Sequence, residues 1–208
     1  MKIPRRLISV LSLSAILFLA ACDREPSLED KPARSGKVTA VGVADIGGPF
    51  ELVDHTGAPF TDQDLLGKPQ LIYFGFAFCP DVCPLALQQM GMALSEIDPD
   101  GSYFRPVFIS VDPERDTPES LSVYVTNNGF PKGLIGLTGT PEQVSAAKAA
   151  YKIYSQKVPD PQSEAGYTVD HASLIYVMDK DGKFVDVFTH DTSTPDIIKA
   201  LKAYKSEH

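Results

Sequence analysis

The chain is poor in cysteine and has no apolar run long enough to cross a membrane comfortably. Three cysteines occur in 208 residues, so at least one thiol is left without an intramolecular partner. A largely apolar run over residues 7–20 falls short of the about 20 apolar residues that a spanning helix needs. Neither an internal repeat nor a low-complexity segment occurs, which excludes a repeat array.

Basic residues are outnumbered by acidic ones. The chain carries 19 Lys and Arg against 27 Asp and Glu, a net charge of −8. Three of the basic residues and none of the acidic ones fall in residues 1–21, so the remainder has a net charge of −11. This excess of negative charge excludes electrostatic binding to nucleic acid or anionic lipid. Hydrophobic residues make up 43% of the chain, enough for a globular domain with a sizeable core.

The N-terminus has the pattern of an export signal. Lys2, Arg5 and Arg6 precede the apolar run, and Leu19-Ala20-Ala21-Cys22 follows it, which predicts a signal peptide over residues 1–21. These four residues resemble the lipobox of bacterial lipoproteins and predict a lipid anchor on Cys22. The alternative is an ordinary cleaved signal beside a chance cysteine. An acylated Cys22 would hold the domain at the bacterial cell membrane, outside the cytoplasm, in the periplasm.

The rest of the chain divides into a tether and a domain. Residues 22–47 contain prolines and glycines among mixed charges, which predicts a flexible tether. We therefore expect one folded domain over residues 48–208.

The hydrophobic pattern of this domain predicts alternating strands and helices. Apolar runs bounded by turn residues predict buried strands, and helical spacing behind Thr-Pro caps predicts helices. The predicted order is a hairpin over 50–61, strand 71–76, helix 85–97, strand 107–111, helix 117–127, strand 134–137, helix 140–151, a polar loop over 157–165, strands 174–178 and 184–188, and helix 193–204. Right-handed crossovers make the three central strands parallel, and the last hairpin adds antiparallel strands. This α/β order resembles the thioredoxin architecture, a mixed sheet flanked by helices, with an extra N-terminal β-hairpin and an inserted loop.

Cys79 and Cys83 are placed for chemistry. Cys79 follows the strand at 71–76, and Cys83 lies in the first turn of the next helix. Unpaired N–H groups at a helix start stabilise thiolates, and side chains four residues apart share one helix face. Two outcomes stay open: a redox-active pair that closes into a disulfide, or two soft ligands for a metal such as Cu(I). Inert burial as structural cysteines is disfavoured by the helix position and the flanking prolines.

Two thiolates alone give a metal ion few ligands. The presence of a third donor side chain therefore decides between a disulfide pair and a metal site. His208 is the last residue, His55 lies in a hairpin turn, and His190 follows an edge strand, and all three are expected in solvent. His171 ends the loop that faces the cysteine-bearing helix in a thioredoxin-type sheet. Thioredoxins usually carry a cis-proline there, whereas no proline occurs over 166–178. From the residues alone, a hydrogen-bonded loop histidine remains the favoured interpretation of His171, with a metal ligand as the alternative.

Several segments resemble the Sco/SenC family, in order along about half of the chain. They are Leu71-Ile72-Tyr73-Phe74-Gly75-Phe76 through Cys79-Pro80-Asp81-Val82-Cys83-Pro84, Phe108-Ile109-Ser110-Val111-Asp112-Pro113-Glu114-Arg115-Asp116-Thr117-Pro118, Gly136-Leu137-Thr138-Gly139-Thr140 and Val169-Asp170-His171. Ala77 and Ala172 stand where relatives often carry threonine and serine, which are conservative differences.

The resemblance implies a membrane-anchored, thioredoxin-like copper metallochaperone rather than an enzyme, assisting assembly of the binuclear copper centre of cytochrome c oxidase. Carried over by position, Cys79 and Cys83 are implied to be thiolate ligands and His171 the imidazole ligand of one Cu(I) or Cu(II) per chain. Implied partners are the copper-bearing oxidase subunit and another periplasmic copper chaperone or thiol reductant. Asp170 is expected either to orient the imidazole or to form a local turn. The loop over 112–116 is expected to form part of a docking face or a turn.

A second hypothesis assigns the same cysteines to an enzyme. A thiol–disulfide reductase that keeps the oxidase's copper-site cysteines reduced would need Cys79 and Cys83 but not His171. The missing loop proline favours copper. A thiol peroxidase is weaker still, because Gly75 and Phe76 offer no hydroxyl where peroxiredoxin-like sites usually carry one.

Overall fold

The computed structural model describes residues 45–208. The predicted signal peptide, the predicted lipidation site Cys22 and the tether as far as residue 44 lie outside the described residues. Among the helices of residues 45–208, none is long and apolar enough to cross a membrane.

The described residues form four α-helices, one 3-10 helix and nine strands. In chain order they are β1 (Glu51–Asp54), β2 (Pro59–Thr61), η1 (Asp62–Leu65), β3 (Gln70–Gly75), α1 (Val82–Ile97), β4 (Arg105–Ser110), α2 (Pro118–Tyr124), β5 (Ile135–Thr138), α3 (Pro141–Ala150), β6 (Ser155–Pro159), β7 (Tyr167–His171), β8 (Leu174–Met178), β9 (Phe184–Thr189) and α4 (Thr194–Glu207).

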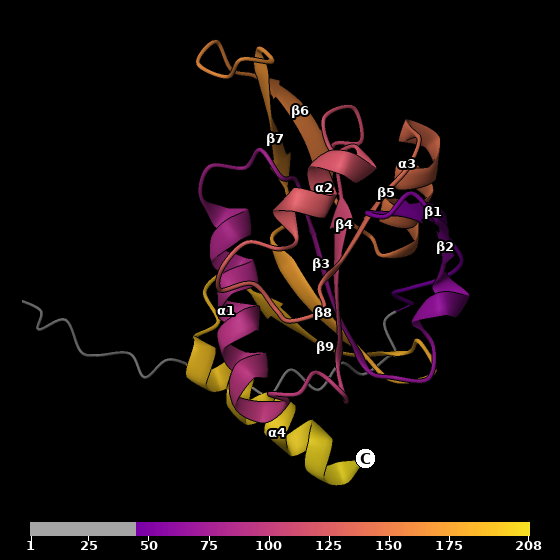
Figure 1. Ribbon diagram of the computed structural model, residues 1–208, viewed down its shortest axis with the longest axis vertical. Coiled ribbons are helices and arrows are strands. Elements are labelled where there is room, and N and C mark those ends of the chain that lie inside the picture. Colours follow the sequence, from indigo (N-terminus) through magenta and orange to yellow (C-terminus); the bar gives the residue numbers. More distant parts are fainter. Residues whose placement is uncertain (1–44) are drawn as a thin grey trace, which may run out of the picture. The chain divides into compact units, whose positions relative to one another are not determined.

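Seven strands form one mixed sheet in the order β2-β1-β5-β4-β3-β8-β9 (Figure 1). β3, β4 and β5 are parallel, with Gly75 opposite Ser110 at the carboxyl ends of β3 and β4. β8 and β9 extend the sheet antiparallel beyond β3, and β1 joins β5 antiparallel on the other side. The predicted α/β order, including the N-terminal hairpin β1–β2, is confirmed.

Strand β3 is buried along its whole length because helices cover both of its faces. Consecutive side chains of a strand point to opposite faces. Tyr73 lies on the face that carries α1, next to Cys83, whereas the ring of Phe74 packs 5.3 Å from that of Tyr151 at the end of α3. α1 and α4 run side by side on the first face (Figure 1).

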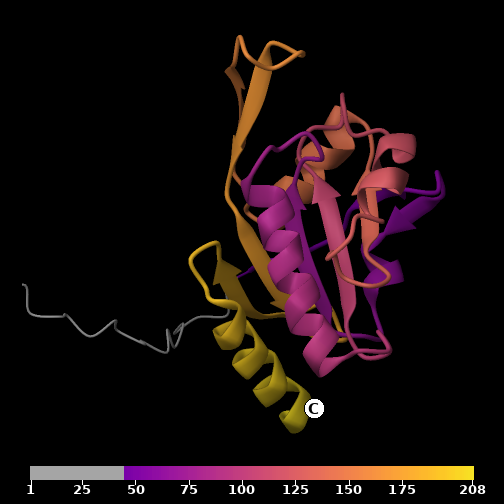
Figure 2. The ribbon, with the colours of Figure 1, turned by 60° about the vertical axis from the view of Figure 1, so that its left-hand side comes forward.

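The prediction of a polar loop over residues 157–165 is wrong in part. Residues Ser155–Pro159 and Tyr167–His171 pair antiparallel as a two-stranded hairpin, β6–β7, and only its tip is irregular. Figure 2 shows this hairpin projecting beyond the rest of the domain. Its residues are mostly exposed or half-buried, so strand pairing rather than burial orders it. A segment ordered in this way leaves little hydrophobic periodicity in the sequence.

The helix caps agree with the sequence, whereas three helix ends differ, including that of α4, which runs to Glu207 rather than to residue 204. Thr117 and Ser193 accept hydrogen bonds from backbone N–H groups of α2 and α4, and Thr140 with Gln143 forms the predicted capping box. α1 begins at Val82 rather than at residue 85, because a proline is tolerated in the first turn. α2 ends at Tyr124, three residues before the predicted end.

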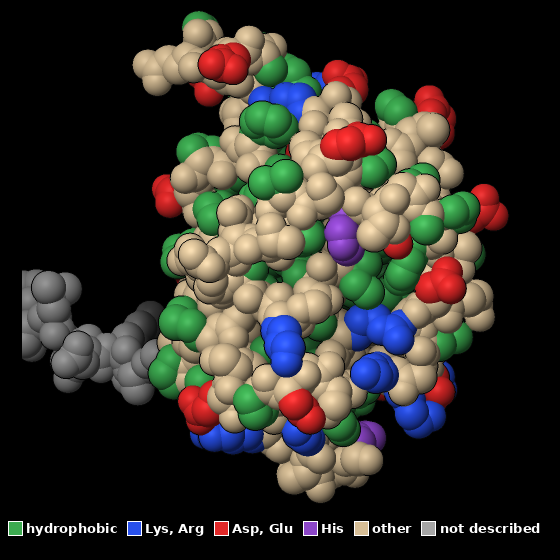
Figure 3. Space-filling model, in the orientation of Figure 1, with side chains coloured by type: hydrophobic (Ala, Val, Ile, Leu, Met, Phe, Trp, Pro, Cys, Tyr) green, Lys and Arg blue, Asp and Glu red, His purple; other side chains and the backbone are tan. Residues whose placement is uncertain are grey.

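Charged side chains are unevenly distributed over one face of the domain. On the face in Figure 3, most Lys and Arg side chains lie in the lower half, whereas Asp and Glu are spread more widely. The upper end, where the cysteine loop lies, therefore presents little positive charge on this face.

Gly91 sets how closely α1 packs against the loop between α2 and β5. A Cβ atom at this position would lie 2.1 Å from the carbonyl oxygen of Gly129. We expect Gly91→Ala to lower the free energy of unfolding by about 2 kcal/mol, as typical of overpacking in a core. Urea unfolding measures this change.

The exposed Ser95→Ala, one turn further along α1, is the control, and it should change stability by less than about 0.5 kcal/mol. Helix propensity alone favours alanine over glycine by about 1 kcal/mol. A Gly91→Ala variant at least as stable as the wild type would therefore contradict the close packing.

Candidate metal centre

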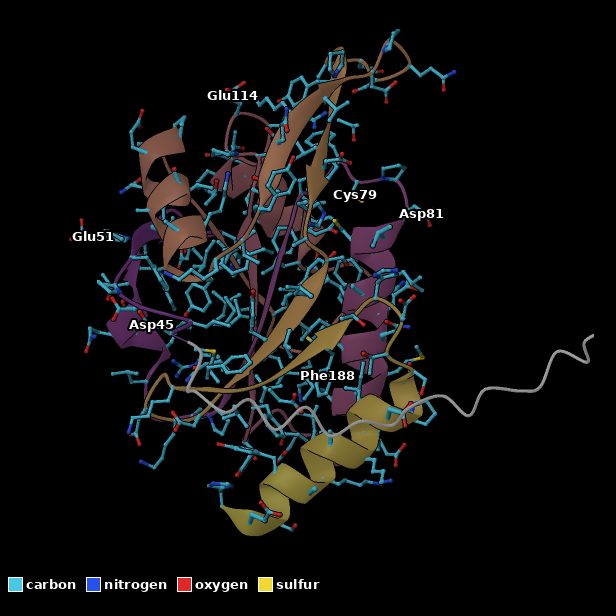
Figure 4. The ribbon with its side chains drawn as sticks, turned by 180° about the vertical axis from the view of Figure 1, so that it is seen from behind. Asp45, Glu51, Cys79, Asp81, Glu114 and Phe188 are labelled. Carbon is cyan, nitrogen blue, oxygen red and sulfur yellow. The ribbon has the colours of Figure 1, made fainter. Side chains whose placement is uncertain are left out.

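Three predicted site residues meet where β3 ends and α1 begins. Cys79 lies in the loop after β3, Cys83 is the second residue of α1, and His171 is the last residue of β7. Cys83 Sγ lies 3.3 Å from Nε2 of His171. Figure 4 shows Cys79 between the start of α1 and the hairpin β6–β7. The fold therefore brings together residues 88 positions apart in the sequence.

The two cysteines are free thiols of very different acidity. The hydrogen bond between their side chains lowers the pKa of Cys79 to about 4, although burial opposes this change. The backbone N–H of Cys83 also donates to Cys79 Sγ at 3.4 Å. The same side-chain contact, together with burial, raises the pKa of the Cys83 thiol. At neutral pH the pair therefore holds one thiolate, on Cys79, and one proton, on Cys83.

The imidazole of His171 is oriented by a backbone carbonyl. Its Nδ1 lies 3.1 Å from the carbonyl oxygen of Ala172, which can only accept a hydrogen bond. Nδ1 therefore carries the proton, and the lone pair of Nε2 faces Cys83. Asp170 takes neither of its two expected roles: the carbonyl of Ala172 rather than the Asp170 carboxylate lies at Nδ1 of His171, and Asp170 itself lies in strand β7, opposite Gln156, rather than in a turn.

Aromatic rings hold the imidazole from two sides. Tyr73 and Phe76 both meet His171 edge-on, with ring centroids 6.2 and 5.8 Å away. The Tyr73 hydroxyl hydrogen-bonds to Ser173 at 3.1 Å, and burial raises the pKa of this phenol. Tyr73 is therefore a neutral wall of the site.

The site opens into a hollow of about 360 Å³. Its walls come from the cysteine loop, from β7 and from the ends of two further segments: Phe76, Cys79, Pro80, Val82, Thr168, Val169, Asp170, His171, Ser173 and His190. Cys79 is half-buried and lines the hollow, whereas Cys83 is fully buried behind it. A ligand or a partner therefore reaches the site from the Cys79 side.

The arrangement of donors suits a soft cation. The Cys79 thiolate and the Nε2 lone pair both face the single proton of Cys83. A cation bound by both sulfurs and the imidazole would satisfy all three, and soft ions prefer this donor set. Across residues 45–208, however, no three His, Cys, Asp or Glu side chains already form a closed ligand group. Binding a shared ion would therefore require these side chains to move closer together.

The other three histidines lie apart from the two sulfurs. The ring of His55 accepts a hydrogen bond from the Gly136 N–H at 3.2 Å and is half-buried rather than solvated. His208 stacks on Tyr204 with ring centroids 4.5 Å apart. His190 is exposed and ion-paired with Asp191, as expected of a surface residue, although it also lines the rim of the hollow.

Gly75 makes room for the buried sulfur, a role that sequence reasoning missed. A Cβ atom on Gly75 would lie 2.9 Å from Cys83 Sγ and 2.8 Å from the Tyr73 ring. An isolated glycine inside an apolar strand is the signal that predicts such a close approach. Tyr73 and Phe76, whose rings line the site, gave no comparable signal, because the sequence pattern predicts them to be ordinary core residues of the strand.

A buried carboxyl group lies behind the cysteine loop. Asp116 accepts hydrogen bonds from Ser110 Oγ at 2.6 Å and from the Ala77 N–H at 3.1 Å. Burial raises the pKa of Asp116 to about 6, with a smaller contribution from the neighbouring Asp112. The Asp116 carboxyl group is therefore still partly protonated near pH 6.

We predict that Cys79 reacts as a thiolate well below neutral pH. In the reduced protein, the rate of its alkylation by iodoacetamide should stay nearly constant from about pH 5.5 to 8. Cys83→Ala removes the hydrogen-bond donor, so its Cys79 rate should instead rise about tenfold per pH unit over this range. Mass spectrometry of the modified peptide measures both. A wild-type rate that climbs steeply between pH 6 and 8 would contradict the low pKa of Cys79.

Asp116 should make the stability of the protein depend on pH. Its folded-state pKa lies above the ordinary value of 3.8, so the free energy of unfolding should fall as pH rises from 4 to 6. Asp116→Asn lacks this titration. Relative to the wild type, we expect the variant to gain about 2 kcal/mol between pH 4 and pH 7, measured by urea unfolding. A difference that does not change with pH would contradict the raised pKa.

The chain matches one family model over most of its length. The model described as SCO1/SenC matches residues 38–206. The mitochondrial SCO1 homolog of Homo sapiens is 42% identical over 169 residues, covering 79% of this chain and 54% of that protein. SenC of Rhodobacter capsulatus is 42% identical over 179 residues, covering 86% of this chain and 79% of that protein. The chain thus spans about half the length of the human relative.

A solved structure supports the same relationship. ScoI of Bradyrhizobium japonicum, solved with copper bound, is 42% identical and superposes with a TM-score of 0.68, covering 76% of this chain and 99% of that chain. The predicted thioredoxin-like fold is therefore confirmed. With the family model and these relatives in agreement, the chain belongs to the SCO1/SenC family.

Proposed function

We propose that this protein is a membrane-anchored copper metallochaperone. It binds one Cu(I) or Cu(II) through Cys79, Cys83 and His171 and assists assembly of the binuclear copper centre of cytochrome c oxidase. The observation that carries the proposal is the contact of His171 Nε2 with Cys83 Sγ. A dithiol needs no imidazole for disulfide chemistry, whereas a copper site gains a third ligand from it.

The donor set favours copper over harder metals. Two sulfurs and one nitrogen suit Cu(I), and Cu(II) is the strongest binder in the divalent series. The relative from Bradyrhizobium japonicum was solved with copper bound, which supports copper as the cargo here. The Nδ1 contact with Ala172 supports the proposed role of His171, because a fixed second nitrogen keeps Nε2 available to a metal.

The surface around Cys79 suits transfer to a protein partner. Phe78, Val82 and Leu85 are 56%, 40% and 51% exposed beside the half-buried sulfur. Exposed apolar groups grouped around a site are typical of protein-binding surfaces. The copper-bearing oxidase subunit is the proposed recipient. A second periplasmic copper chaperone or a thiol reductant is the proposed supplier or activator of the site.

Anchoring is proposed from the N-terminal sequence. Acyl chains on Cys22 would hold the domain at the outer face of the bacterial cell membrane, with residues 22–47 as the tether. This placement keeps the domain close to a membrane-embedded oxidase.

One observation favours thiol–disulfide reduction as a second candidate function. A half-exposed cysteine of low pKa beside a buried one of raised pKa is the pairing that disulfide exchange uses. In that reaction the Cys79 thiolate attacks a substrate disulfide and Cys83 resolves the mixed disulfide. Two thiols here become a disulfide, and their two electrons and two protons convert the substrate disulfide into two thiols.

Copper titration of the reduced protein against a Cu(I) chelator tests the proposal. We expect one Cu(I) per chain and a dissociation constant that rises about tenfold or more in His171→Ala. His190→Ala is the matched control, because His190 lines the same hollow but is exposed and paired with Asp191. Its affinity should stay within about twofold of the wild type.

The two candidate functions separate in this experiment. An unchanged affinity in His171→Ala, together with efficient reduction of a disulfide substrate by that variant, would contradict the chaperone and favour the reductase.

A further inference from the structure

The loop between β4 and α2 touches both halves of the candidate metal centre. This loop, residues 112–116, is kept compact by two backbone hydrogen bonds, since the N–H groups of Arg115 and Asp116 donate to the carbonyl oxygen of Asp112. Figure 4 shows Glu114, at its tip, beside the hairpin β6–β7. It therefore lies between the loop that carries Cys79 and the strand that carries His171.

The guanidinium of Arg115 lies among rings from both halves. Its central carbon is 4.2 Å from the ring centroid of Tyr167, which starts β7. On the other side it lies 5.6 Å from the ring of Phe76 and 5.3 Å from that of Phe78, the two aromatic residues that precede Cys79. Cation–π contacts of this kind are attractive within about 6 Å of the centroid. Arg115 thus joins the cysteine loop to the histidine strand.

The loop over 112–116 holds Tyr167 at three points. Its ring contacts Arg115, its hydroxyl donates to both carboxylate oxygens of Asp112 at 3.0 and 3.3 Å, and its carbonyl accepts from Arg115 Nη1 at 3.4 Å. Asp112 is fully buried and also accepts from Arg115 Nε. Since Tyr167 lies four residues before His171 on the same strand, these contacts fix the strand that positions the imidazole.

The same loop holds the cysteine side through Asp116. Both of its carboxylate oxygens accept from the Ala77 N–H, two residues before Cys79, at 3.1 and 3.2 Å. Ser110, at the end of β4, donates to the same carboxylate. One short loop therefore contacts the backbone of both segments that carry the proposed ligands.

Two features distinguish this arrangement from an ordinary surface ion pair. The Arg115 side chain is only 14% exposed, whereas Lys157 and Glu114 in the neighbouring ion pair are 43% and 60% exposed. Exposed pairs of that kind contribute little. Arg115 also keeps one buried nitrogen, Nη2, without a hydrogen-bond partner in the described residues. The surrounding aromatic rings therefore help to fix the position of the guanidinium, in addition to its hydrogen bonds.

We propose that Arg115 is a positioning residue for the metal centre: with Asp112 it clamps the hairpin β6–β7 through Tyr167 and so holds His171 within reach of the two cysteines. The proposal rests on the proposed copper site, in which His171 is a ligand. Without the clamp, the hairpin would still be tied to the domain at β8 but would lose its contacts at Tyr167. His171 would then sample positions away from Cys83.

Two measurements on the purified protein test the clamp. In Arg115→Gln, hydrogen exchange of the β6 and β7 amides should become about tenfold faster, while β3 and β4 exchange as in the wild type. The Cu(I) dissociation constant should rise about fivefold in Arg115→Gln, but not further when Arg115→Gln is added to His171→Ala. Tyr167→Phe, which keeps the ring and removes the hydroxyl, should have a smaller effect in the same direction and serves if Arg115→Gln does not fold.

Glu114→Gln is the matched control, since it removes the exposed ion pair to Lys157 between the same loop and the same hairpin but keeps Lys157 Nζ, 4.5 Å from the Tyr167 ring centroid, and every contact of Arg115. It should leave both measurements within twofold of the wild type. Unchanged hairpin exchange in Arg115→Gln or Tyr167→Phe would overturn the clamp, and so would an equal loss of affinity in the presence and absence of His171. If His171→Ala alone leaves copper affinity unchanged, the proposed ligand set fails, and the positioning role falls with it even where exchange still shows a clamped hairpin.

Discussion

The contact between the Cys83 sulfur and Nε2 of His171 is the interaction on which the site depends. It joins the first turn of α1 to the end of a hairpin that lies 88 residues further along the chain. Together with the Cys79 thiolate it places three lone-pair donors around a single proton. Such an electron-rich group is stabilised by a proton or by a soft cation, so the same geometry favours both proton sharing in the metal-free protein and the proposed copper binding.

The scaffold around this contact holds its two sides in different ways. Cys83 is fixed by α1, by the buried strand β3 and by the space that Gly75 leaves for its sulfur. His171 lies instead on a hairpin whose strands pair only with each other. Its position depends on local contacts, namely the Ala172 carbonyl, two aromatic rings and the Tyr167 contacts of the 112–116 loop.

The fold and the cysteine pair were predictable because each left a local signal. Continuous apolar runs marked β3 and β4, Thr-Pro caps marked α2 and α3, and the spacing of Cys79 and Cys83 placed both near a helix start. The hairpin β6–β7 was missed because its strands are ordered by pairing rather than by burial. The orienting group of His171 was missed as well, since a backbone carbonyl carries no sequence signal. The convergence of His171 on Cys83 followed from the family resemblance and not from periodicity.

In the proposed centre, two sulfurs and one imidazole bind the copper. X-ray absorption at the copper edge of the Cu(I)-loaded protein tests this ligand set, because it reports the ligand atoms themselves. We expect two sulfur ligands and one nitrogen ligand with imidazole scattering, and the loss of that scattering in His171→Ala. A spectrum with two sulfurs and no imidazole, unchanged in the variant, would contradict it.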